Sequence, residues 1–268
     1  MSDSNKSIQN IYSKQYVIRY SETGANGRIT CQNILNYFQD IGSDHAGVLG
    51  ISAFDLIQKN MAWVIYEMQL HIFDYPKWDT PFTLSTWRYP YRKLYEIRAF
   101  EGKKDDGAIV FSGKCSWVMI HLKNKQPVRL NKHLPDVLLN NYIKIDHTFE
   151  SIIPPDKHDC ESDHEVRMHH LDFNQHVNNI IYLQWALENT PMDIQTRLLP
   201  AQVDIHFSGD AHLGDHIKCF SQKVDHNPTF VHQIMHTEKK IKLTLIQTRW
   251  KAFDYKPCLR INPILQSQ

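Results

Sequence analysis

Hydrophobic and polar residues alternate most regularly between residues 63 and 73. Side chains of a β-strand point to opposite faces in turn, so this alternation predicts a strand with one buried face. Further strand-like runs cover residues 82–88, 93–100 and 109–121, separated by Pro, Gly, Asp and Lys residues typical of turns. Together the four runs predict an antiparallel meander.

A different period precedes the meander. Between residues 30 and 49, apolar side chains recur every three or four positions, at Ile34, Phe38 and Ile41. This spacing predicts an amphipathic helix with a broad apolar face. Such a helix is suited to lie across an antiparallel sheet as one layer of an α+β domain.

The same order of elements returns in the second half of the chain. After a loop-rich stretch, the pattern predicts a second helix over residues 177–189 and a second meander over 201–254. A repeated order of this kind indicates an internal duplication. We therefore expect two tandem hotdog domains, each a long helix on an antiparallel sheet, with the sheets joined side by side. The predicted boundaries are an N-terminal domain 1–125, a linker 126–160 and a C-terminal domain 161–268.

Composition narrows the function classes. Thirty Lys and Arg residues against 29 Asp and Glu give a formal charge of +1, which offers no field to recruit nucleic acid or an anionic membrane. The chain has no long apolar run and no apolar region at its start, so we expect a soluble cytoplasmic protein without a membrane span. Five scattered cysteines without a CxxC pair indicate neither a disulfide framework nor a zinc knuckle.

Three polar residues stand at alternate positions just before the second predicted helix: Asp172, Asn174 and His176. In an extended segment they would project the same way and converge on one spot. Asp and Asn are also favoured at helix starts for purely structural reasons, so capping is the alternative explanation. In isolation the capping explanation would be preferred.

The longer run from Asp172 to Glu188 reverses that preference. It reads D-F-N-Q-H-V-N-N-I-I-Y-L-Q-W-A-L-E and resembles the acyl-ACP thioesterase family, whose second hotdog carries D-x-N-x-H-V-N-N-x-x-Y-x-x-W-x-x-E. Residues 28–30, 39–46 and 61–63 extend the resemblance into the first half. The resemblance implies hydrolysis of fatty acyl-[acyl-carrier-protein] thioesters to free fatty acid, with acyl carrier protein as partner and neither a metal nor an organic cofactor.

Thioester hydrolysis needs an attacking water or carboxylate, a base and donors for the developing oxyanion. Asp172 could be base or nucleophile, Asn174 could orient the carbonyl or the water, and His176 could shuttle a proton. Exposed N–H groups in the first turn of the following helix could receive the oxyanion. Members of the family, plant ones especially, place Glu-Cys where this chain has Asp210-Ala211. Because this cysteine is absent, a mechanism based on carboxylates is favoured over one with a Cys–His pair. Asp210 is therefore the fourth catalytic candidate.

Other residues receive supporting assignments. We expect an acyl tunnel in the first half, lined by Phe38, Met61, Trp63 and Ile65. Packing and local hydrogen bonding are assigned to Asn178, Tyr182 and Trp185. The histidines and acids of residues 158–164 fit no tetrahedral pattern, so this stretch is interpreted as a solvated linker and not as a metal site.

Alternatives stay open at the level of function and assembly. An acyl-CoA thioesterase or a non-catalytic acyl-binding hotdog module would share the same fold, and the duplication allows either a monomer or a homodimer. Acyl carrier protein is strongly acidic, so a basic patch could steer its docking. Two basic clusters are present: Arg88, Arg92, Lys93 and Arg98, and Lys123, Lys125, Arg129 and Lys132.

Overall fold

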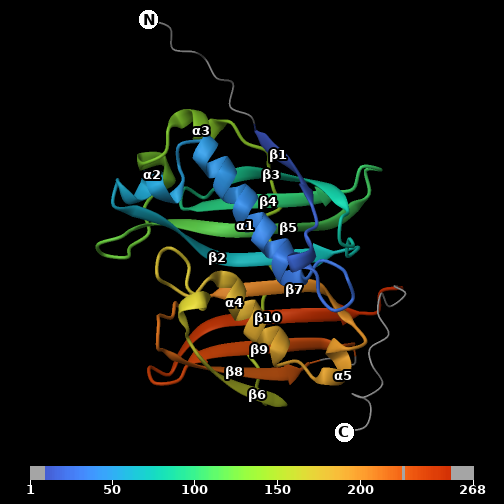
Figure 1. Ribbon diagram of the computed structural model, residues 1–268. Helices are drawn as coiled ribbons and strands as arrows, with labels where there is room; N and C mark the ends of the chain where they lie inside the picture. The colour runs from blue at the N-terminus through green and yellow to red at the C-terminus, as the bar shows by residue number, and fades with distance from the viewer. Residues whose placement is uncertain (1–9, 225–226, 255–268) are drawn as a thin grey trace, which may run out of the picture.

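Ten strands form one antiparallel sheet in the computed structural model, which describes residues 10–224 and 227–254 (Figure 1). Their spatial order is β1-β3-β4-β5-β2-β7-β10-β9-β8-β6. The first half contributes β1 Ile11–Val17, β2 Met61–Ile72, β3 Pro81–Tyr91, β4 Tyr95–Lys103 and β5 Ile109–His121. The second contributes β6 Cys160–Glu165, β7 Leu199–Phe207, β8 His216–Lys223, β9 Thr229–His236 and β10 Ile241–Lys251.

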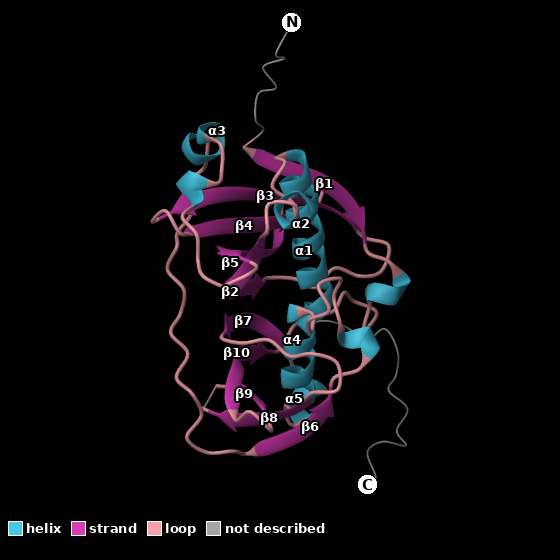
Figure 2. Cartoon of the chain, turned by 90° about the vertical axis from the view of Figure 1, so that its left-hand side faces the viewer, coloured by secondary structure: helices cyan, strands magenta, loops and turns pink. Residues whose placement is uncertain are grey.

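Two long helices lie on one face of this sheet (Figures 1 and 2). Helix α1 (Cys31–Val48) covers the first half and α4 (Asn179–Glu188) covers the second. Side-chain caps set both starts, because the Thr30 hydroxyl accepts from the Asn33 amide and the Asn178 side chain accepts from the Ile180 amide. Shorter helical turns are α2 Ala53–Ile57, α3 Asp136–Asn140, α5 Met192–Gln195, η1 Tyr20–Glu22, η2 Leu130–Lys132 and η3 Met168–His170.

The double hotdog predicted from the sequence is confirmed, with a strand before each long helix. The predicted meanders are wrong in one respect, because β2 pairs with β5 and β7 pairs with β10. Alternation shows which face of a strand is buried but carries no information about its partner. Placing β2 and β7 at the centre lets them pair from Glu67↔His206 to His71↔Gln202 and join the two halves.

Strand β6 corrects a second expectation. The stretch 158–164 was interpreted as a solvated linker, yet Cys160–Glu165 pairs antiparallel with β8 at the sheet edge. Edge strands are commonly short and rich in charged residues, which protects the sheet from pairing with other chains. The polar composition of this segment therefore concealed a strand. The boundaries 1–125, 126–160 and 161–268 stay a prediction.

The core of the first half lies between α1 and the sheet. Ile34, Phe38 and Ile41 are buried on the sheet-facing side of α1, and the Phe38 ring stacks on Phe100 with 4.4 Å between centroids. A Cβ at Gly113 would lie 2.5 Å from the Phe38 ring, so only glycine permits this close approach. Across the described residues, no helix combines the length and apolar character needed to cross a membrane.

The chain between β5 and β6 runs over the opposite face of the sheet (Figure 2). It is tied down by ion pairs that come from both halves. Lys114 of β5 lies 3.0 Å from Asp146, and Arg249 of β10 lies 2.5 Å from Glu150. The connection therefore covers the back of the sheet and leaves the helical face to form the site.

His232 on β9 is the clearest buried titratable group of the second half. Its Nδ1 lies 2.6 Å from the Ser221 hydroxyl oxygen and its Nε2 lies 3.0 Å from the Thr248 hydroxyl oxygen. Burial lowers the pKa of His232 to about 3, whereas a histidine in the unfolded chain titrates near ~6.5. Between these values the unfolded state binds a proton that the folded state excludes, so stability falls as the pH falls.

We expect His232 to destabilise the protein by about 1.4 kcal/mol for each pH unit below ~6.5, until its folded pKa is reached. Urea unfolding at several pH values between 6.5 and 4.5 should therefore give a steeper loss of stability for the wild type than for His232→Gln, although the variant starts less stable. Parallel pH profiles of the two proteins would contradict this assignment.

Candidate active site

Residues 172–176 form a tight turn before α4. The Asp172 amide donates to the His176 carbonyl at 2.8 Å and the Gln175 amide donates to the Asp172 carbonyl at 3.0 Å. The Asp172 carboxylate accepts from the Asn174 amide at 2.8 Å, a local bond that competes with extended structure. The expectation of an extended segment is therefore wrong, and the three polar residues surround a turn.

The first half carries the same turn, but without a carboxylate or an imidazole. There the Gly24 amide donates to the Arg28 carbonyl at 2.9 Å and the Gly27 amide donates to the Gly24 carbonyl at 2.9 Å. The Arg28 guanidinium donates to the Tyr75 carbonyl. The matching backbone bonds support the internal duplication, while the side chains on the two turns differ.

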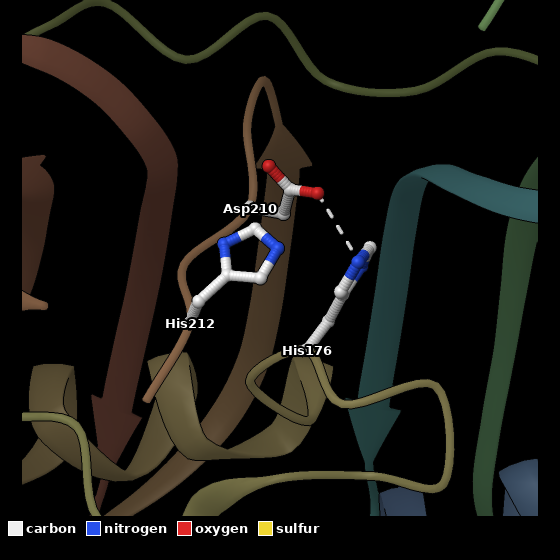
Figure 3. Close-up of side chains that lie close together, drawn as sticks. All are labelled: His176, Asp210 and His212. Carbon is white, nitrogen blue, oxygen red and sulfur yellow. Dashed lines mark ion pairs between the residues drawn. The ribbon is translucent and has the colours of Figure 1, made fainter. Parts of the chain in front are cut away.

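A backbone bond brings the second turn to the segment after β7. The Val177 amide donates to the Ala211 carbonyl at 2.9 Å. This contact sets His176 beside Asp210, with 3.3 Å between Nδ1 and Oδ2 (Figure 3). The side chains are 35% and 56% exposed, respectively, so the pair is open to a ligand from solvent.

Asp172 has a structural role in addition to any chemical one. Its Oδ1 accepts from the Asn174 amide and, at 3.4 Å, from the His176 amide. Its Oδ2 accepts from the Asn174 side-chain amide at 3.4 Å. The helix cap itself is Asn178, so the capping explanation holds for Asn178 and not for Asp172 or Asn174.

His212 was missed by the sequence analysis. Its ring packs edge-on against His176 with 4.7 Å between centroids, and Figure 3 shows it on the same segment as Asp210. The Asp-x-His spacing after β7 is the only signal that could have indicated it. Ligand atoms of His176, Asp210 and His212 lie within 4.8 Å of one another and could hold a divalent cation. The expectation that the protein needs no metal stays a prediction.

The supporting residues lie behind the turn on α4. Tyr182 and Trp185 are buried and contact each other edge to face at 5.6 Å. Trp185 also stacks on His164 of β6 at 5.1 Å. Burial and then the negative charge of Asp210 raise the pKa of Tyr182, which keeps its hydroxyl protonated. Both side chains therefore fix α4 against the sheet.

A small, largely apolar pocket begins where the turn ends. It lies between α1, the start of α4 and strands β2, β4 and β5. Its lining consists of Leu35, Phe38, Gln39, Ile65, Met68, Phe100, Cys115, Trp117, Asn179 and Ile180. Two of the four predicted tunnel residues, Phe38 and Ile65, are present. Met61 and Trp63 lie instead in a separate apolar cluster, where the Trp63 indole donates to the Ile51 carbonyl at 3.1 Å.

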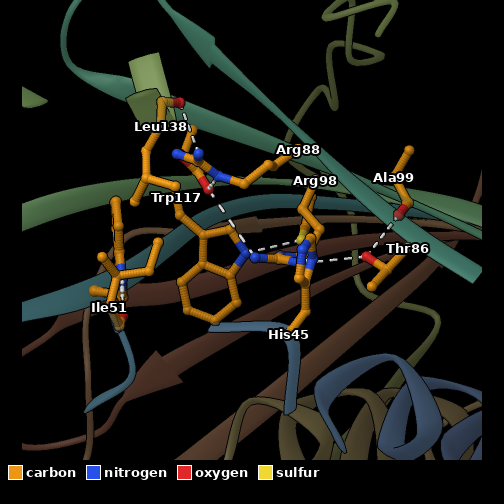
Figure 4. A network of polar contacts seen from close by, with 11 residues as sticks. His45, Ile51, Thr86, Arg88, Arg98, Ala99, Trp117 and Leu138 are labelled. Carbon is orange, nitrogen blue, oxygen red and sulfur yellow. Dashed lines mark hydrogen bonds and ion pairs between the residues drawn. The ribbon is translucent and has the colours of Figure 1, made fainter. Parts of the chain in front are cut away.

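Beyond Cys115 and Trp117 the helical face of the sheet becomes charged (Figure 4). Arg88 donates to both carboxylate oxygens of Glu96, at 2.6 and 2.5 Å. Arg98 lies 2.9 Å from His45 Nδ1, and burial lowers the pKa of its guanidinium. Arg88 and Arg98 are thus buried, and the expectation that they belong to an exposed basic cluster is wrong. The grouping by positive charge did not take account of Glu96, whose carboxylate the β3–β4 hairpin places between the two arginines.

Comparison with known proteins gives a consistent family assignment. Residues 9–138 match the acyl-ACP thioesterase N-terminal domain and residues 153–252 match the acyl-ACP thioesterase C-terminal domain. Oleoyl-acyl carrier protein thioesterase 1 of Arabidopsis thaliana is 26% identical over 205 residues, covering 68% of this chain and 56% of the relative. Palmitoyl-acyl carrier protein thioesterase of Gossypium hirsutum is 27% identical over 200 residues, covering 69% and 48%. The chain spans about half the length of these curated relatives.

Solved structures show the same fold. An acyl-ACP thioesterase from Bacteroides thetaiotaomicron superimposes with a TM-score of 0.79 at 19% identity, covering 90% of this chain and 98% of that one. The 12:0-ACP thioesterase from Umbellularia californica gives 0.79 at 17% identity, covering 91% and 98%. Because the two matched domains together cover most of the sequence, the chain belongs to the acyl-ACP thioesterase family.

Proposed function

We propose that this protein hydrolyses the thioester of a fatty acyl group carried on acyl carrier protein and releases the free fatty acid. One observation carries the proposal. The turn with Asp172, Asn174 and His176 faces Asp210 and leads directly into the helix whose first residues line the apolar pocket. Family membership supports the class of substrate, since the matched relatives are named for oleoyl- and palmitoyl-acyl carrier protein.

The carboxylate of Asp172 is the base in this proposal. Its Oδ1 accepts from two backbone amides, whereas Oδ2, within the described part of the chain, accepts only from the Asn174 side chain, at 3.4 Å. Oδ2 and the side-chain amide of Asn174 are therefore the groups that hold the water. The water oxygen attacks the carbonyl carbon as Asp172 takes its proton. Collapse of the tetrahedral intermediate breaks the C–S bond. The leaving sulfur takes up the proton that Asp172 removed from the water, relayed through His176, so both side chains return to their starting state. Asp210 keeps the imidazole oriented by facing Nδ1, so Nε2 is the nitrogen that exchanges protons.

The amide of Asn179 is the proposed oxyanion donor. The Val177 and Asn178 amides are engaged by the Ala211 and His170 carbonyls. The Ile180 amide is engaged by the Asn178 side chain. Asn179 begins α4 and lines the pocket, and none of the described residues accepts from its amide. At the positive end of the helix dipole, this N–H is suited to a developing negative charge.

Hydrolysis of acyl-CoA is the rival activity, because the pocket and the turn could receive either pantetheine carrier. A non-catalytic acyl-binding module is the rival of another class, and the cysteine missing beside Asp210 is the observation in its favour. A cytoplasmic location and a monomeric or homodimeric assembly belong to the same set of proposals.

We expect the purified protein to release free thiol from acyl carrier proteins loaded with chains from short to long, with a maximum at one length. Its kcat/KM on the best acyl-ACP should exceed that on the same acyl group attached to CoA. A higher value on CoA would favour the rival activity. A tight acyl complex without any thiol release would establish the binding module instead.

A further inference from the structure

Exposed cations gather at one end of the first hotdog sheet. They lie on the β3–β4 turn, on the chain after β5, around η2 and just before β2. The set, named here the basic end, is Lys59, Arg92, Lys93, Lys123, Lys125, Arg129 and Lys132. Backbone bonds hold its parts together: the Leu130 amide donates to the Lys93 carbonyl at 2.8 Å, and the Leu122 amide donates to the Asn60 carbonyl at 2.9 Å.

Strand register places the basic end and the active site at the same end of the sheet. Met61 at the start of β2 pairs with His121 at the end of β5, so Lys59 and Lys123 lie on neighbouring chain ends. Strands β2 and β7 are antiparallel, and β7 runs toward the start of β2. The segment with Asp210 therefore leaves the sheet at the same end, which is the left-hand side of the sheet in Figure 1.

These cations are free to attract a partner. Among residues 10–224 and 227–254, none of the seven takes part in an ion pair, whereas the buried Arg88 and Arg98 both lie against Glu96. Asp55, the carboxylate of α2, is bound to Ser52. Exposed and unpaired charges of one sign create a local field even in a chain with a formal charge of +1.

An apolar contact spans the gap between the basic end and the catalytic turn. Phe54 of α2 and Phe173, which lies between Asp172 and Asn174, contact each other with 5.6 Å between ring centroids. They are 71% and 61% exposed. Solvent-facing aromatic rings beside an open site are typical of surfaces that bind another molecule.

We propose that the basic end, with Phe54 and Phe173 at its inner edge, is the docking surface for the acidic carrier protein that delivers the acyl group. This inference rests on the proposed function, which supplies the identity of the carrier. Acidic side chains of the carrier pair with the basic end, and the aromatic rings guide the prosthetic arm past the catalytic turn into the pocket. The Phe54–Phe173 contact connects the two regions, so the arm of a docked carrier would cross these rings to reach the site.

The test is a charge reversal at three positions of ordinary backbone geometry, Lys59→Glu, Lys123→Glu and Arg129→Glu combined. The matched control reverses Lys157, Lys223 and Lys251, which are exposed. Lys223 and Lys251 end β8 and β10 away from Asp210. The substrates are acyl-ACP and the same acyl group on N-acetylcysteamine, which has no protein and no phosphate.

We expect the basic-end variant to lose about tenfold or more in kcat/KM on acyl-ACP at low salt and to lose most of its salt dependence. On the N-acetylcysteamine thioester it should stay within about twofold of the wild type, and the control variant should match the wild type on both substrates. An unchanged kcat/KM on acyl-ACP, or an equal loss in the control variant, would overturn the proposal.

Failure of the proposed function can be told apart from failure of the docking surface. Binding of holo-ACP without an acyl group, measured by surface plasmon resonance, requires no hydrolysis. Weaker binding by the basic-end variant alone supports the docking surface even if the wild type hydrolyses nothing. Equal binding by all three proteins refutes it even if the wild type is an active thioesterase.

Discussion

Replacing His176 with Ala, or either Asp172 or Asp210 with Asn, is expected to lower kcat on acyl-ACP by about 10²- to 10⁴-fold. Asp172→Asn keeps an oxygen for the Asn174 and His176 amides, so the turn should survive while the base is lost. Asp210→Asn replaces the carboxylate that lies 3.3 Å from His176 Nδ1 with a neutral amide, so the imidazole loses the partner that orients it. Steady-state thiol release measures the effect.

Acyl binding should survive in these variants, because none of the three side chains lines the pocket. Affinity for a non-hydrolysable acyl-ACP analogue is therefore expected to stay within a few fold of the wild type. Asp193→Asn is the matched control, since Asp193 is an exposed carboxylate paired with Arg197 on a remote helix. If both Asp172→Asn and Asp210→Asn retained wild-type turnover, the carboxylate mechanism would be excluded.

Most of the secondary structure could be predicted from the sequence, because an element with one buried face repeats its apolar residues regularly. The repeat is every second residue in a strand and every third or fourth residue in a helix. The order of strands could not be predicted in the same way. Strand β2 lies between β5 and β7, so both of its partners are distant in the sequence, and the β2–β7 pairs join residues more than a hundred positions apart. The edge strand β6 was missed because its polar composition resembles that of a linker.

In the candidate site, too, residues that are close in the sequence could be predicted, whereas contacts between distant segments could not. Asp172, Asn174 and His176 were identified from a contiguous run, but the turn that they form depends on a side-chain-to-backbone bond that the run does not reveal. The position of Asp210 beside His176 depends on the Val177–Ala211 backbone bond. His212 had no signal beyond its spacing from Asp210. Burial of Arg88 and Arg98 depends on Glu96, a neighbour defined by hairpin register.

Replacing Glu96 with Ala is expected to reduce the free energy of unfolding by about 3–5 kcal/mol. The variant leaves the Arg88 guanidinium buried without its bidentate partner and leaves Arg98 with hydrogen bonds but no nearby carboxylate. A buried positive charge without a counterion destabilises the folded state, because nothing compensates for the loss of its hydration. Urea unfolding followed by tryptophan fluorescence measures the loss, and Trp117, which pairs with Glu96 across β4 and β5, reports locally.

Glu101→Ala on the same strand is the matched control. Glu101 pairs with Lys103 at 2.6 Å, but both side chains are partly exposed, so removing it should cost no more than about 1 kcal/mol. Equal losses in the two variants would show that the Arg88–Glu96–Arg98 network does not stabilise the fold. The network also lies where the apolar pocket stops, because Arg98 and Glu96 are the cross-strand neighbours of the pocket residues Cys115 and Trp117. An acyl chain reaching further would have to bury its methyl end against charged groups, which favours chains that end before them.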